Sequence, residues 1–117
     1  MNSIQKLLEK KVLIYSENNL YYGILTKLEE HANYFNIELL NCREIDNIYD
    51  NDSMIKLAKY IRSNKFNTND YYDDSMIEHE SEIYITINRK SKIYECQRND
   101  LHQIEIFPTS KKFRNED

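Results

Sequence analysis

The sequence is poor in glycine, proline, tryptophan and cysteine. Its 117 residues include one glycine, Gly23, one proline, Pro108, and no tryptophan. Phosphate-binding loops of the P-loop and dinucleotide-binding types need several glycines, so their chemistry is not expected. The two cysteines, Cys42 and Cys96, are too few for a disulfide scaffold and form no CxxC pair for zinc. We therefore expect a nuclear or cytoplasmic protein with no metal or other cofactor.

Long apolar runs and an excess of positive charge are also missing. No stretch approaches the roughly 18 apolar residues that a transmembrane helix needs, and the first residues lack the features of a secretory signal. The formal net charge is −4, so the chain has no overall basic surface for nucleic acid. The negative charge is concentrated in residues 70–82, which contain no Lys or Arg. Because the rest of the chain is nearly balanced, a local binding site for RNA or protein is compatible with this composition.

The hydrophobic pattern predicts one short helix followed by β-strands. Residues 3–11 carry apolar side chains at helical spacing, with Ser3 as the N-cap. Five strands are expected after it, over residues 12–15, 20–28, 34–45, 82–97 with an interruption at 89–91, and 101–107. Gly23 lies in the middle of the second strand, where a glycine is typical of a sharp bend or a close approach of two backbones.

A polar insert separates the third predicted strand from the fourth. Residues 46–81 are rich in Asp, Asn and Ser and contain one helical stretch, 53–62, which Ser53 is expected to cap. The remainder of the insert and the tail, 109–117, are predicted to be loops. Neither half of the chain has enough strands to form a core alone, so we expect a single domain over residues 1–117.

Two segments carry a more specific pattern. The first contains Val12-Leu13-Ile14, then Tyr22-Gly23-Ile24-Leu25, then Tyr34-Phe35-Asn36-Ile37-Glu38-Leu39, and ends at Glu44-Ile45. The second runs from Ile93 through Arg98-Asn99 to Ile104, followed by Ile106-Phe107-Pro108. Together they resemble the two motifs of the Sm and Sm-like (LSm) family. The resemblance implies a mainly β fold: an N-terminal helix and a strongly bent five-stranded antiparallel sheet or partly open barrel.

The resemblance also implies an RNA site. Tyr34 takes the place of the residue that stacks on a base, and His31 is a second candidate for stacking. Asn36 takes the place of the residue that reads the base edge, and Arg98 supplies a guanidinium group. Asn99 is a weaker contact. These side chains suit unstacked bases, which bind aromatic or guanidinium planes and a few fixed donors and acceptors.

The sequence departs from the family pattern at three points. The connection between strands two and three is longer, and Asn99 replaces the glycine of the second motif. The aspartate of the first motif falls on Ala32, so Glu29 or Glu30 would have to substitute for it. Simpler interpretations also stay open: Tyr34 as an ordinary strand residue, and Asn36 as a side chain that satisfies a turn.

Two functions follow from these observations. The first is an RNA-binding subunit of an Sm-like ring or ribonucleoprotein, acting on single-stranded U-rich RNA in splicing or decay. The alternative is an Sm-fold scaffold subunit that binds protein and not RNA. In both, neighbouring subunits pair through strand edges, expected at 93–97 and 101–107. No nucleophile or metal-ligand spacing is found among the cysteines and histidines, so we expect no enzymatic activity.

Overall fold

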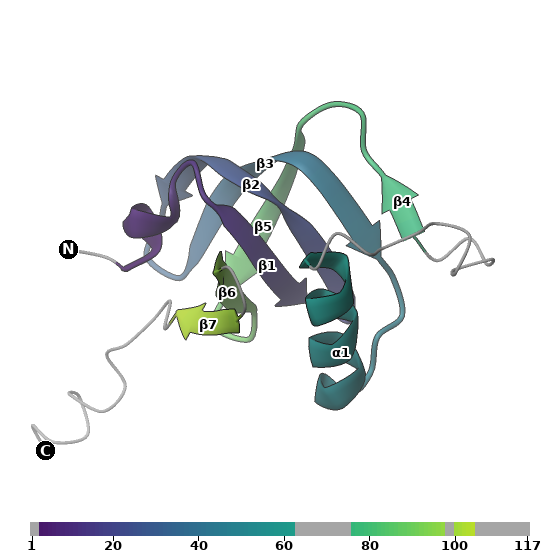
Figure 1. Cartoon of the computed structure of the whole chain (residues 1–117). Coiled ribbons are helices and arrows are strands. Elements are labelled where there is room, and N and C mark those ends of the chain that lie inside the picture. Colours follow the sequence, from purple (N-terminus) through teal and green to yellow (C-terminus); the bar gives the residue numbers. More distant parts are fainter. Residues whose placement is uncertain (1–2, 63–75, 98–99, 105–117) are drawn as a thin grey trace, which may run out of the picture.

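The chain forms a curved antiparallel β-sheet with little helix (Figure 1). A computed structural model describes residues 3–62, 76–97 and 100–104. In these ranges the elements are η1 (Ser3–Leu7), β1 (Lys11–Ser16), β2 (Asn19–Glu30), β3 (Tyr34–Ile45), α1 (Asn51–Arg62), β4 (Met76–Glu78), β5 (Ile83–Asn88), β6 (Lys92–Gln97) and β7 (Asp100–Ile104). The mainly β prediction is confirmed, but the described part of the sheet has seven strands rather than five.

The N-terminal helix is shorter than predicted and is a 3-10 helix, η1. Ile4 and Leu7 are buried, whereas Leu8 is partly exposed. Glu9 has a positive φ of 69°, and its N–H donates to the Leu25 carbonyl at 2.7 Å. The backbone therefore leaves the helix to join β2, because this bond to the sheet replaces the next helical bond.

The long strands β2 and β3 bend together at Gly23. A Cβ added there would lie 3.0 Å from the Leu40 carbonyl oxygen and 3.2 Å from the Cα of Cys42. The pairing register shifts between Tyr22 and Ile24, and Asn41 of the facing strand has a positive φ of 56°. Only a residue without Cβ fits this approach unstrained, so the predicted role of Gly23 is confirmed.

Beyond this bend, β3 pairs with two short strands on its outer edge. Its C-terminal end, Arg43–Ile45, pairs with β4, and its N-terminal half, Tyr34–Leu39, pairs with β5. The sequence pattern missed β4, which lies inside the predicted loop. The predicted fourth strand is two strands, because β5 pairs with β3 whereas β6 pairs with β1 on the other side of the sheet.

This pairing changes the expected edges of the sheet. The strand order is β4-β3-β2-β1-β6-β7, with β5 beside β3. The segment 93–97, predicted as an edge, is therefore an interior strand between β1 and β7. Among the described strands, β7 is the edge at one end and β5 is an edge at the other. The predicted extension of the last strand through 105–107 lies outside the described residues.

Buried side chains fill both faces of the sheet. One cluster lies around Phe35 and includes Val12 and Ile14 of β1. The other contains Leu13 of β1 and Met54 of α1. Because successive residues of a strand point to opposite faces, the continuous apolar run of β1 serves both clusters. Helix α1 covers the second cluster near the C-terminal ends of β1 and β3 (Figure 1).

Helix α1 begins earlier than predicted. Asp50, not Ser53, is the N-cap: its Oδ1 accepts the Ser53 N–H at 2.7 Å and its Oδ2 accepts the Ser53 hydroxyl at 2.7 Å. The bond from the Ser53 N–H lowers the pKa of the Asp50 carboxyl below its ordinary value. Aspartate and serine are comparable N-caps, and the observed bonds assign the role to Asp50. None of the helices in the described ranges is long and apolar enough to cross a membrane.

Candidate functional site

The β2–β3 hairpin ends in a short connection. The predicted long connection, 29–33, is reduced to residues 31–33, and the hairpin is closed by the His31 N–H bonded to the Tyr34 carbonyl at 2.9 Å. The extra residues extend β2, so that Glu29 pairs with Asn36 and Glu30 with Phe35. Sequence spacing alone misplaces Glu29, because it does not reveal how far the two strands continue to pair.

Asn36 is held between two neighbours in adjacent strands. Its Nδ2 donates to Glu29 Oε1 at 3.0 Å, and its Oδ1 accepts the Thr86 hydroxyl at 2.7 Å. The register places all three residues in one row across β2, β3 and β5, on the same face. Thr86 was not singled out from the sequence. An amide has two N–H groups and two lone pairs, so with respect to the described residues one donor and one acceptor site of Asn36 are still available in a fixed orientation.

His31 and Tyr34 form a ring stack beside this row. Their ring centroids lie 4.4 Å apart with an angle of 14° between the planes. The His31 Nε2 lies 2.6 Å from Glu29 Oε1, the same oxygen that accepts the bond from Asn36. These bonds, that from His31 foremost, hold the pKa of the Glu29 carboxyl below its ordinary value. Glu29 thus connects the stacked rings to the amide.

The turn between β5 and β6 lies at the same end of the sheet. Tyr34 pairs with Asn88, the last residue of β5, and the turn that follows contains two exposed cations, Arg89 and Lys90. The turn is ordered: the Asn88 side-chain oxygen accepts the Lys90 N–H at 2.9 Å, and the Ser91 N–H donates to the Asn88 carbonyl at 3.0 Å. The sequence pattern predicts residues 89–91 only as an interruption of a strand, although the adjacent Arg and Lys are a usable signal for a cationic turn.

Two other predicted site residues, Arg98 and Asn99, lie outside the described residues. The described turn beside Tyr34 contains Arg89 and Lys90 and precedes β6. The structure therefore brings together His31, Tyr34 and Asn36. The described turn beside them supplies two cations, Arg89 and Lys90.

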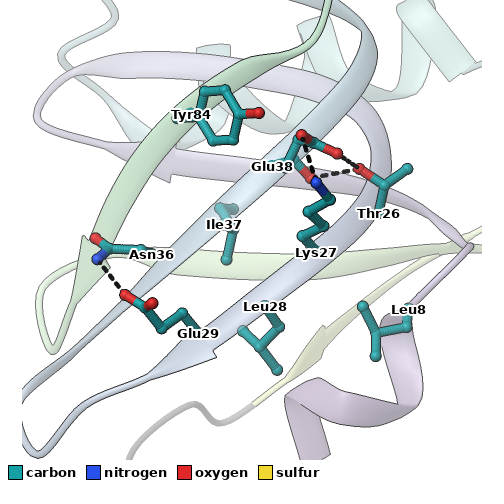
Figure 2. A pocket seen from close by; sticks show the side chains of 9 residues that line it. All are labelled: Leu8, Thr26, Lys27, Leu28, Glu29, Asn36, Ile37, Glu38 and Tyr84. Atoms are coloured by element: carbon teal, nitrogen blue, oxygen red, sulfur yellow. Dashed lines mark hydrogen bonds and ion pairs between the residues drawn. The ribbon is translucent and has the colours of Figure 1, made fainter.

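An open groove of about 590 Å³ continues from Asn36 along β2, β3 and β5 (Figure 2). Glu38 lies within it and is nearly buried; it accepts the Thr26 hydroxyl at 2.7 Å and forms an ion pair with Lys27 at 3.7 Å. Hydrogen bonds from Thr26 and then Tyr84 lower the pKa of the Glu38 carboxyl. With its oxygens already bonded, Glu38 holds three strands together and is poorly suited to bind a ligand or ion itself.

Comparison with known proteins adds no assignment: no family model matches the sequence, and neither a curated protein nor a solved structure does. Within the described part of the chain, no group of three or more His, Cys, Asp or Glu side chains is arranged to hold a metal ion. The candidate site is therefore defined by the ring stack, the oriented amide and the nearby cationic turn.

Proposed function

We propose that this protein binds single-stranded RNA at the end of the sheet formed by the β2–β3 connection and the β5–β6 turn. The observation that carries the proposal is the orientation of the Asn36 amide by Glu29 and Thr86, next to the His31–Tyr34 stack. A base that stacks on an aromatic plane can present its edge to a fixed donor and acceptor.

The arrangement also supports the resemblance to the Sm-like family. A curved antiparallel sheet with a glycine at the bend of its second strand accords with it. The carboxylate expected four residues before Asn36 is absent because Ala32 stands there, and Glu29 contacts Asn36 in its place. We propose accordingly a subunit of an Sm-like assembly acting in RNA processing in the nucleus or cytoplasm, with U-rich RNA as its ligand.

Assembly in this proposal uses the open sheet edges. Because β6 is paired on both sides, the described edge that a neighbouring subunit would extend is β5 or β7, or the three-residue strand β4. An added strand on such an edge gains main-chain hydrogen bonds that the isolated chain lacks.

A second candidate function is a scaffold that binds protein and not RNA. It is favoured by the carboxylates of Glu29 and Glu38 on the same face, and by a net charge of −4. Phosphates approach such a face only where cations neutralise its negative charge, and in the described ranges Lys27 and the turn residues Arg89 and Lys90 are available for this.

Fluorescence anisotropy with a labelled U-rich RNA strand separates these two functions. Tyr34→Ala should remove a stacking contact and weaken binding by about 1–3 kcal/mol. Tyr49→Ala is the matched control, because Tyr49 is 73% exposed and lies outside the site. Equal affinities for the two variants, or no binding by the unmodified chain, would favour the scaffold.

The remaining groups are tested in the same assay. Asn36→Ala should reduce the preference for U-rich over A-rich RNA, because the amide reads the base edge. Arg89→Ala with Lys90→Ala should weaken binding to both RNAs and reduce the dependence of the affinity on salt, since fewer counterions are released. Arg98→Ala, made separately, should act in the same way if the originally predicted turn contacts RNA.

A further inference from the structure

Within the described ranges, the outer edge of β5 is open, and its sequence carries no charge, proline or glycine of the kind that protects an edge strand. Of the described strands, only β3 pairs with it. Its six residues, IYITIN, include no charge, no proline and no glycine. Natural edge strands are normally short, charged, bulged or interrupted by proline, because an uncharged edge of high β-propensity pairs with other chains.

The apolar side chains of β5 are also incompletely covered. Ile87 is fully buried, but Ile83 and Ile85, which point to the same face, are only partly buried against the core. On the opposite face Tyr84 is 67% exposed. A strand added to this edge would extend the core over the two isoleucines.

The other described edges, β4 and β7, differ in composition. Strand β4 has only three residues, of which Glu78 carries a charge. Strand β7 has five residues, of which Asp100 carries a charge and His102 and Gln103 are polar and exposed. Such strands have the usual protection of an edge. The unprotected edge is therefore β5, and its partner must offer a strand complementary to it.

The sequence of β5 is complementary to itself when two copies run antiparallel. Centred on Ile85, the residues pair as Ile85 with Ile85, Ile83 with Ile87 and Tyr84 with Thr86, each with a residue of the other copy. Isoleucines then face isoleucines across the core side, and each tyrosine lies beside a β-branched threonine on the outer side. Such pairs are favourable, and no like charges oppose each other.

We infer that the partner of β5 is a second copy of this chain, joined by antiparallel β5–β5 pairing about a two-fold axis at Ile85. The inference develops the assembly part of the proposed function and is independent of RNA binding. A two-fold axis through antiparallel strands is perpendicular to the sheet, so the two copies present their Asn36 rows on the same face of one continuous sheet. Each β5 edge is used once, so this assembly is a closed dimer.

Sedimentation velocity of the full chain without RNA tests the stoichiometry. Over a wide concentration series the mass should rise from that of one chain to that of two and stop there. A single-chain mass at every concentration would overturn the inference, and so would a ring-sized species, which requires pairing of β5 with a different strand. Because RNA is absent, either outcome leaves the RNA-binding proposal to its own assay.

Thiol cross-linking tests the register. With a short bifunctional thiol reagent, Ile85→Cys should give a covalent dimer above the wild-type background, since the two copies of residue 85 lie opposite each other. Tyr49→Cys, which is more exposed to the reagent than residue 85, should not exceed that background. Cross-linking that is equal for both variants would show that the β5 edges do not meet at Ile85.

A pair of double variants tests the same register on the exposed face and avoids the core. Tyr84→Lys with Thr86→Lys places like charges opposite each other twice and should leave a single-chain mass. Tyr84→Lys with Thr86→Glu places opposite charges there and should retain the dimer. Circular dichroism confirms that each variant is folded, and the same mass for both folded variants would contradict the proposed register.

Discussion

Replacing Gly23 by alanine tests the close approach that bends the sheet. The new Cβ would lie 3.0 Å from the Leu40 carbonyl oxygen and 3.2 Å from the Cα of Cys42. Both are backbone atoms, so neither can rotate away as a side chain would. Overpacking of this kind costs about 1–3 kcal/mol, whereas the reduced entropy of the unfolded chain returns about 0.4–1 kcal/mol.

The expected net result is a loss of about 1–2 kcal/mol in the free energy of unfolding, from the difference between these two effects. For a domain of this size that corresponds to roughly 4–8 °C in the melting temperature. Urea unfolding followed by circular dichroism measures the free energy, and a thermal scan gives the temperature.

Gly23→Val provides the comparison that separates sterics from strand propensity. Valine favours strands more than alanine does, so propensity alone predicts that the valine variant is the more stable of the two. Contact with the backbone of β3 predicts the opposite order, because valine adds two further methyl groups at the same place. A valine variant as stable as the alanine variant, or an alanine variant more stable than the wild type, would refute the proposed contact.

Three further predictions concern the helix cap, a cysteine and the core. The bond from the Ser53 N–H lowers the pKa of the Asp50 carboxyl, so the cap stabilises the fold at pH values above the ordinary aspartate pKa. This contribution is lost as the pH falls through the lowered pKa of the folded chain. The difference in melting temperature between the wild type and Asp50→Ala should therefore shrink in acid. Burial raises the pKa of the Cys42 thiol to about 12. Mass spectrometry should therefore find this thiol unalkylated in the folded chain and alkylated in urea. The free energy of unfolding should fall as the pH rises above 9.0, the ordinary pKa of the thiol. Phe35→Ala should lower the free energy of unfolding by about 3–5 kcal/mol, whereas Tyr49→Ala, at an exposed position, should change it by less than about 0.5 kcal/mol in the same urea titration.

The local pattern of the sequence was sufficient for most of the strands and for the bend. The signals that sufficed act between neighbours in the chain. They are the apolar run around Leu13, the alternation of apolar and polar residues after Tyr34, and the single glycine within a strand. They predicted β1, β3 and the position of Gly23 correctly. The start of α1 was less well predicted, because serine and aspartate are both good caps and only the observed bonds distinguish Asp50 from Ser53.

The partners of each strand were decided by the tertiary structure alone. Nothing in residues 82–97 indicates that β5 pairs with β3 while β6 pairs with β1, since both halves have the same strand-like composition. That choice brings Asn88 beside Tyr34 and Thr86 beside Asn36. Glu29 reaches Asn36 for the same reason: the length over which β2 and β3 pair depends on hydrogen bonds between distant residues. The sequence by itself determined most of the extended segments and the position of the bend. The candidate site, whose side chains are up to 61 residues apart from Glu29 to Lys90, exists only because long-range pairing sets the register.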